Sequence, residues 1–147
     1  MNEETLKFSV ELSGTYWGKK PQFSIWLDEH VIVQSEIQSN PQVINFERQV
    51  SDGSHSLSIR LENKDHTDTV TRNGEIVQDM LLNINDIVIN DISLGNLLWT
   101  AEYILDEPQE YRGKTITRLD SCVNLGWNGT YKLSFTSPFY NWLLEKL

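Results

Sequence analysis

Four oxygen-bearing side chains that could bind a metal ion lie in and just after the stretch HSLSIRLENKDHTDT, residues 55 to 69. Asn63, Asp65 and Asp68 follow an alternating run of residues, and Asp79 comes a short way further along the chain. Calcium takes roughly six to eight hard oxygen ligands from Asp, Asn and backbone carbonyls, and a loop leaving a strand can supply several of them. These four residues are therefore the candidate metal ligands, and calcium is the cofactor that they suggest.

The same residues have a second interpretation. Asn and Asp side chains close polar turns through hydrogen bonds to nearby backbone groups. Their spacing also lacks the glycine and the glutamate that a helix-loop-helix calcium loop requires at fixed positions. The sequence thus leaves a cation site and a polar turn as alternatives.

Aromatic residues in glycine-containing loops are the second chemical signal. Tyr16 and Trp17 lie in GTYWGKKP, and Trp127 lies in LGWNGTY. Flat rings at the rim of a sheet can stack against the apolar faces of sugars, although Trp17 could equally cover the core as a lid. We therefore take Tyr16, Trp17 and Trp127 as candidate ligand-binding residues. The following Asn128-Gly129 predicts the turn of a hairpin.

Charge and composition exclude several kinds of partner. The chain of 147 residues has a formal net charge of -9, which disfavours nucleic acid and anionic membrane surfaces. No stretch approaches the ~18 apolar residues of a membrane span, and the start MNEETLKFSV lacks the basic and apolar regions of a signal peptide. We therefore expect neither nucleic acid nor membrane partners, and synthesis in the cytoplasm.

Alternating runs separated by turn residues predict an all-β fold. The predicted strands cover residues 6–12, 22–28, 30–37, 43–50 and 55–61, with turns at Asp28-Glu29, Asp52-Gly53 and Asn73-Gly74. In residues 80–94 the alternation slips near Asp86, which indicates a β-bulge. An acidic stretch from Asp106 to Glu110 is predicted to be a loop. About nine or ten short strands at this spacing favour an antiparallel β-sandwich of the jelly-roll type.

The C-terminal segment differs from the rest. We expect a β-sandwich domain over residues 1–136 and an aromatic tail over 137–147. Ser137-Pro138 is a typical helix start, and Phe139, Trp142, Leu143 and Leu147 follow at helical spacing. The tail is predicted to be a short helix or an extended docking segment. Its aromatic residues need a surface, in the same molecule or in a neighbouring subunit of a homo-oligomer.

Enzyme signatures are absent from the sequence. It contains no glycine-rich phosphate loop, no His-x-x-x-His pair and no Gly-x-Ser-x-Gly elbow. Paired carboxylates such as Glu62 and Asp79 leave glycan cleavage as an alternative, because the distance between two carboxyl groups cannot be derived from sequence. The main expectation is a protein without catalytic activity.

The middle of the chain resembles a known family. The stretch DGSHSLSIRLENKDHTDT, followed by DMLLNINDIVIND, resembles the calcium-dependent xylan-binding carbohydrate-binding modules over roughly residues 50 to 92. The resemblance implies a β-sandwich of the jelly-roll type that binds glycans, with Asn63 and Asp65 at the Asn-Asp pair of the family pattern. Lys64 stands between these two residues and departs from that pattern.

A second resemblance concerns the setting of the protein. The segments NKDHTDTV, LGWNGTY and SPFYNWLLEKL are similar to segments of virion proteins of large tailed marine bacteriophages. This similarity implies a protein of the phage particle, for head or tail decoration or for adhesion to host glycans, with glycans or other virion proteins as partners. A purely structural virion protein without glycan binding is the alternative.

Overall fold

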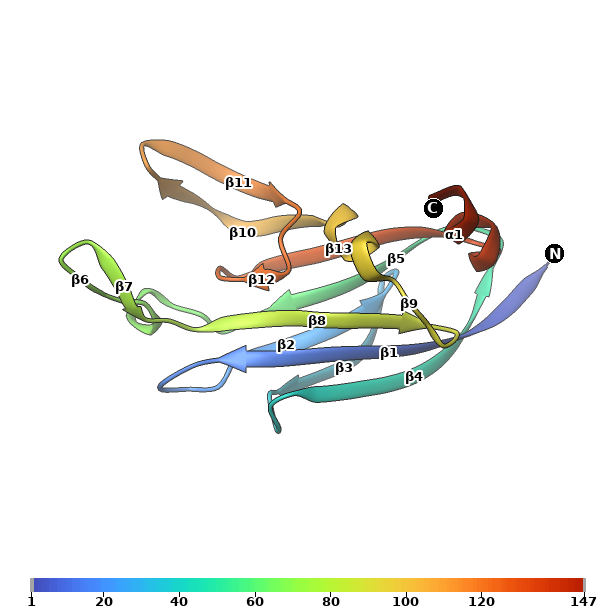
Figure 1. The fold of residues 1–147 in the computed structure, drawn as a ribbon, viewed down its shortest axis with the longest axis horizontal. Helices are drawn as coiled ribbons and strands as arrows, with labels where there is room; N and C mark the ends of the chain where they lie inside the picture. The colour runs from blue at the N-terminus through green and yellow to red at the C-terminus, as the bar shows by residue number, and fades with distance from the viewer. Residues whose placement is uncertain (1, 147) are drawn as a thin grey trace.

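The computed structural model describes residues 2 to 146, which form two antiparallel β-sheets packed face to face (Figure 1). The first sheet has the order β12-β8-β1-β4, with β9 also paired to β8. Its strands are β12 (Asn124–Leu125), β8 (Leu81–Ile89), β1 (Glu3–Thr15), β4 (Gln42–Ser51) and β9 (Ile92–Ser93). The second sheet has the order β11-β10-β13-β5-β2-β3. Its strands are β11 (Lys114–Asp120), β10 (Glu102–Tyr111), β13 (Gly129–Ser137), β5 (Gly53–Leu61), β2 (Gln22–Leu27) and β3 (His30–Glu36).

The remaining elements are short. β6 (Val70–Arg72) and β7 (Glu75–Gln78) form a separate hairpin, and 3₁₀ helices lie at His66–Asp68 and Gly95–Thr100. The hairpin turns at Asn73-Gly74, as predicted, with φ angles of 53° and 80° that favour these two residue types. Among the described residues there is one α-helix, α1, which covers Phe139–Lys146. Within residues 2 to 146, no helix is both long and apolar enough to cross a membrane.

The core lies between the two sheets and follows the predicted alternation. In β1 the side chains of Leu6, Phe8, Val10 and Leu12 are at most 2% exposed, because successive residues of a strand point to opposite faces. The predicted slip near Asp86 is confirmed. The pairing of β8 with β1 shifts between Glu11 and Leu12, so that Asn85 is the extra residue of a β-bulge. The expected antiparallel β-sandwich is thus confirmed.

Two local predictions were wrong. The acidic stretch 106–110 belongs to β10, although its pairing with β11 is interrupted between Ile104 and Gln109. Asn128-Gly129 does not form a hairpin turn, because β12 and β13 belong to different sheets. Gly129 is needed for a different reason: a Cβ atom there would lie 2.5 Å from the carbonyl oxygen of Ile104 on the neighbouring strand.

The C-terminal segment is a helix that packs on its own sandwich. Phe139 and Trp142 are 0% and 5% exposed and belong to the same core as the strands. The carboxylate of Glu4 accepts hydrogen bonds from the Ser137 hydroxyl and, at 2.7 Å, from the backbone N–H of Phe139. Leu147 lies outside the described residues. The tail therefore finds its surface within the molecule, and oligomerisation through it stays a prediction.

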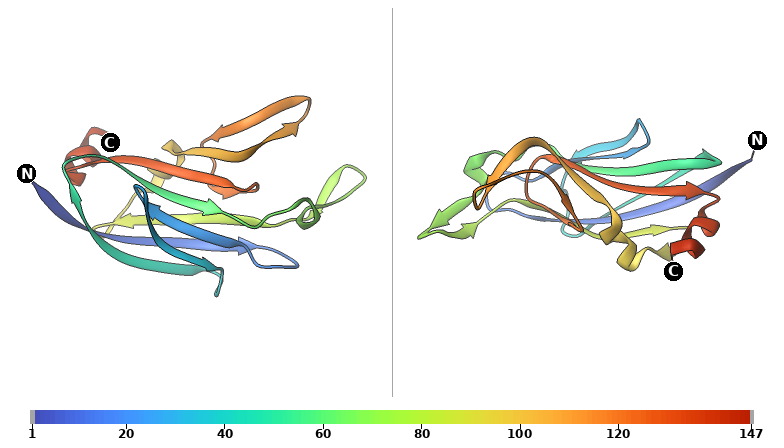
Figure 2. Two further views of the ribbon diagram at one scale, coloured as in Figure 1. Left: turned by 180° about the vertical axis from the view of Figure 1, so that it is seen from behind. Right: turned by 90° about the horizontal axis from the view of Figure 1, so that it is seen from above.

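The two ends of the sandwich carry different structures. Helix α1 and the beginning of β1 lie at one end, whereas the β6–β7 hairpin and the loop between β1 and β2 lie at the other (Figures 1 and 2). The loop between β12 and β13 and the outer part of β10 also face this second end (Figure 1). The residues singled out in the sequence for binding lie in the loops of that end.

Candidate functional site

A cleft of about 710 Å³ opens at the loop end of the sandwich. We call it the rim cleft. Its walls come from the loop after β5, from β10 and from the loop before β13. It is lined by Lys64, Asp65, His66, Thr69, Asp106, Glu107, Gln109, Trp127 and Asn128. The cleft has the size of a small-ligand site and combines one large ring with many polar groups.

The buried Tyr103 side chain positions Trp127. Its hydroxyl donates a hydrogen bond to the carbonyl oxygen of Trp127 and accepts one, at 3.1 Å, from the backbone N–H of the same residue. Burial raises the pKa of Tyr103, so the phenol keeps the proton that it donates. Because Tyr103 is itself 1% exposed, the backbone of Trp127 is fixed to the core while its ring is half-buried beside the cleft.

Asp65 and Asp68 organise the 3₁₀ helix that forms one side of the cleft. The Asp65 side chain accepts a hydrogen bond from the backbone N–H of Thr67 at 2.8 Å, and Asp68 accepts one from the backbone N–H of Asp65 at 2.8 Å. This reciprocal arrangement is a capping box. Lys19 lies 2.8 Å from Asp65 and 3.1 Å from Asp68, and its hydrogen bond holds the pKa of Asp65 well below the ordinary value.

The predicted aromatic loop lies against this helix. The indole N–H of Trp17 donates to the carbonyl oxygen of Asp68 at 2.9 Å, while its ring stays 50% exposed. Tyr16 is 36% exposed. The sequence signals at residues 16–17 and 63–68 therefore belong to one region. Trp127 and Asp65 line the rim cleft, whereas Tyr16 and Trp17 lie outside its lining.

Asp79 is paired with Lys64 behind the cleft. Its Oδ1 atom accepts hydrogen bonds from the Lys64 ammonium at 2.7 Å, the Thr69 hydroxyl at 2.6 Å and the backbone N–H of Met80 at 2.8 Å. Burial raises the pKa of this carboxyl, but the three hydrogen bonds outweigh burial and hold the pKa below its ordinary value. Asp79 is therefore a stable anion that is already neutralised by Lys64.

The four predicted metal ligands do not fit a calcium site in this arrangement. Asn63 accepts a hydrogen bond from the Gln22 N–H at 2.7 Å and donates to the Lys20 carbonyl at 2.9 Å, so it closes a turn. Asp65 and Asp68 share Lys19, and Asp79 binds Lys64. Within the described part of the chain, no three His, Cys, Asp or Glu side chains form a group that could hold a metal ion. The polar-turn interpretation accounts for the geometry of Asn63, Asp65 and Asp68.

Several residues of the cleft could not be identified from the sequence. His66, Asp106, Glu107, Gln109 and Asn128 line it. The acidic stretch at 106–110 was visible, but its place opposite Trp127 depends on the pairing of β10 with β13. Asp106 is held by the Arg60 guanidinium, whose Nη2 lies 3.1 Å and 3.0 Å from the two carboxylate oxygens.

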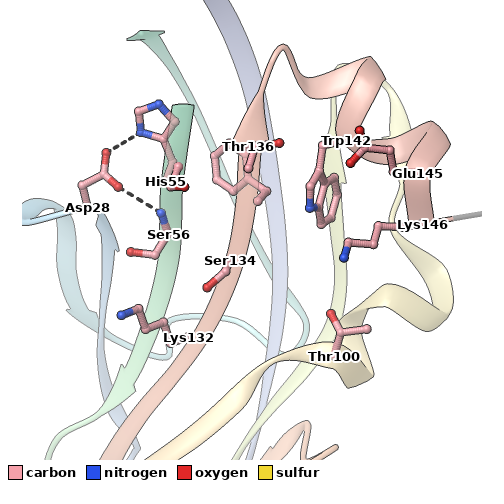
Figure 3. A pocket seen from close by; sticks show the side chains of 12 residues that line it. Asp28, His55, Ser56, Thr100, Lys132, Ser134, Thr136, Trp142, Glu145 and Lys146 are labelled. Atoms are coloured by element: carbon pink, nitrogen blue, oxygen red, sulfur yellow. Dashed lines mark hydrogen bonds and ion pairs between the residues drawn. The ribbon is translucent and has the colours of Figure 1, made fainter. Parts of the chain in front are cut away.

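A second hollow, of about 620 Å³, lies at the opposite end between β5, β13 and helix α1 (Figure 3). His55 and Asp28 form a close pair there, with Nδ1 of His55 2.8 Å from Oδ2 of Asp28, and Figure 3 also shows Ser56 and Ser134 nearby. The other ring nitrogen, Nε2, lies 2.6 Å from the carbonyl oxygen of Ser51. Because both nitrogens are engaged, neither is available to activate a serine, and this group does not form a Ser-His-Asp relay.

Comparison with known proteins gives a match in structure and none in sequence. No protein-family model and no curated protein matches the chain. One solved structure that it resembles is described as "vCBM60 in complex with galactobiose", with a TM-score of 0.50 and 10% sequence identity. That match covers 86% of this chain and 96% of the other.

A further solved structure of vCBM60 gives a TM-score of 0.54 at 11% identity, covering 87% of this chain and 89% of the other. Its description concerns circular permutation as "an evolutionary link between two families of calcium-dependent carbohydrate binding modules". At such low identity the likeness concerns the fold. The resemblance predicted from residues 50 to 92 is confirmed at that level: the chain has the β-sandwich fold of calcium-dependent carbohydrate-binding modules.

Proposed function

We propose that the protein is a non-catalytic glycan-binding module and that the rim cleft is its binding site. The observation that carries the proposal is the position of Trp127, whose ring lies at a cleft lined by carboxylate, amide and hydroxyl groups. A sugar offers an apolar face for an aromatic ring and hydroxyl groups around its edge for polar partners. The fold shared with carbohydrate-binding modules supports the same assignment.

The polar groups of the cleft are suited to sugar hydroxyls. Asp65, Asp106 and Glu107 are acceptors, and the side-chain amide of Gln109 offers both a donor and an acceptor. Asp106 is fixed by Arg60, and Asp65 by Lys19 and Thr67, so these acceptors are held in place before a ligand arrives. A preorganised site loses less conformational entropy on binding.

The lowered pKa values of two carboxyl groups, Asp65 and Asp79, support glycan binding rather than glycan cleavage. A glycoside hydrolase needs a carboxylic acid whose pKa is raised so that it can protonate the leaving group. In Asp65 and Asp79 the pKa is lowered instead, by hydrogen bonds that include those from Lys19 and Lys64. Both residues are therefore anions with structural partners.

We further propose that the protein is located in the phage particle. It rests on the similarity of three sequence segments to virion proteins and stays a prediction. A purely structural particle protein is the second candidate, and the exposed Tyr140 and Leu144 of helix α1 would then be contacts to other subunits.

Screening of the isolated protein on an array of neutral, amino and acidic glycans tests the proposal. We expect reproducible binding to a subset of glycans, without release of shorter products when the same glycans are incubated with the protein. Absence of binding across the array, together with a stable oligomer in solution, would support the structural role. Accumulation of cleavage products would instead show an enzyme.

A further inference from the structure

The side chain of Lys64 is unusually buried for a loop lysine. It is 9% exposed, although lysine is rarely buried unless it is paired. It donates hydrogen bonds to the Asp79 carboxylate at 2.7 Å and to the carbonyl oxygen of Gly126 at 2.5 Å. A positive charge thus lies among hard oxygen atoms at the end of the sandwich that carries the rim cleft.

These contacts join three segments that are distant in the chain. Lys64 follows β5, Asp79 precedes β8, and Gly126 lies between β12 and β13. Thr69, after the 3₁₀ helix, donates to the same Asp79 oxygen at 2.6 Å. A single cationic group therefore fixes the loops behind the rim cleft, which is the task that a bound metal ion performs in many small domains.

The backbone of Lys64 is fixed as well as its side chain. The Asn128 amide accepts a hydrogen bond from the Lys64 N–H and donates one to the Lys64 carbonyl, each at 2.8 Å. The point from which the Lys64 side chain extends is therefore fixed to the loop that carries Trp127. A divalent cation at this position would meet the Lys64 charge at contact distance, and the repulsion would oppose its binding.

We propose that the ammonium of Lys64 is a built-in cation that replaces a metal ion, so that the loop end of this sandwich is organised without calcium. The proposal concerns the folded chain alone and does not depend on which glycan the rim cleft binds. It separates this protein from modules of the same fold that are described as calcium-dependent.

Thermal unfolding of the wild-type protein gives the first test. We expect the same midpoint after removal of divalent ions with a chelator and after addition of millimolar calcium, because a ligand stabilises a protein only when it binds the native state. A midpoint that falls in chelator and rises by several degrees with calcium would overturn the proposal. This test uses the unmodified chain and needs no variant to fold.

A charge-removing variant gives the second test. Lys64→Met keeps most of the aliphatic stem and leaves the Asp79 carboxylate without its counter-charge, and we expect the midpoint to fall by about 6 to 15 °C. In the double variant with Asp79→Asn, the loss should be smaller than the sum of the two single losses, because the two groups are coupled. Lys114→Met, at an exposed position of β11, is the matched control. If Lys64→Met costs no more than this control, or if the double variant is strictly additive, the proposal fails.

Discussion

The side-chain amide of Asn128 holds both backbone groups of Lys64. It accepts from the Lys64 N–H and donates to the Lys64 carbonyl, each at 2.8 Å, across 64 positions of sequence. In this way a side chain supplies the pair of hydrogen bonds that a neighbouring strand would otherwise supply. The loop that carries Trp127 is thereby fixed to the loop that carries Asp65.

Asn128→Ala should therefore destabilise the protein. Two hydrogen bonds are lost, and each contributes about 1 kcal/mol, so we expect a loss of about 2 kcal/mol in the free energy of unfolding. Urea unfolding followed by tryptophan fluorescence measures it. Asn96→Ala, at an exposed position of the second 3₁₀ helix, is the control and should change little. Equal stability of the two variants would contradict the role given to Asn128.

Gly129→Ala should be costly although the residue lies in a regular strand. Its Cβ atom would lie 2.5 Å from the Ile104 carbonyl oxygen and 3.0 Å from the Leu105 Cα atom, and backbone atoms of a paired strand cannot move away cheaply. We expect a loss of about 1–3 kcal/mol, the usual range for overpacking. Gly18→Ala is the matched control, because nothing lies within 4 Å of its added Cβ atom. Similar unfolding midpoints in urea for the two variants would show that the strands are not packed this closely.

The His55 pair predicts a pH dependence of stability. Burial lowers the pKa of His55, but its contacts with the Asp28 carboxylate and the Ser51 carbonyl, together with the negative charge of Glu4, outweigh burial and raise it. A raised pKa in the folded state means that protonated His55 stabilises the fold below the unfolded value of about 6.5. This contribution is lost as the pH rises through the folded pKa.

Urea unfolding at a series of pH values from about 5 to about 9 checks this sign. We expect the wild type to lose stability relative to His55→Gln as the pH rises through the titration of His55. His30→Gln, at an exposed position, should keep the wild-type pH profile. A His55→Gln profile parallel to that of the wild type would contradict the prediction.

Helix α1 should be an integral part of the fold. Trp142 is 5% exposed and packs its ring edge against Phe135, at 6.3 Å between ring centroids. We expect Trp142→Ala to cost about 3–5 kcal/mol, as is typical of a buried aromatic side chain. Tyr140→Ala, whose side chain is 51% exposed, should cost far less. Thermal unfolding of both variants decides whether residues 137–147 belong to the domain or form a separate tail.

Much of the fold could be predicted from sequence because the strands are half-buried. The runs around Leu6, Phe23 and Leu57 alternate cleanly, and alternation determines which face of a strand is buried. The bulge at Asn85 was also detectable as a change of phase. The role of Asn128-Gly129 was not, because the local pattern resembles a hairpin turn and the decisive contacts come from Lys64 and Ile104.

The candidate site could be predicted only in part. Polar residues after β5 and the glycine-flanked Trp127 were visible as local signals, and both are present in the rim cleft. Their partners were not visible, because Lys19 and Asp106 come from other segments that long-range strand pairing brings close. Lys64 was visible beside Asp65, but its pairing with Asp79 was not. The sequence shows where many oxygen ligands lie close together in the chain. Only the structure shows that lysine ammonium groups already bind these carboxylates.

The most direct test of glycan binding at the rim cleft is titration calorimetry with the best glycan from the array, on the wild type and on Trp127→Ala. Trp99→Ala, an exposed tryptophan outside the cleft lining, is the control. We predict that Trp127→Ala weakens binding about tenfold or more in a variant that is still folded at the titration temperature, although loss of the partly buried ring lowers its unfolding midpoint. Trp99→Ala should bind like the wild type. Equal affinities of the Trp127→Ala variant and the wild type would contradict the assignment of the rim cleft as the binding site.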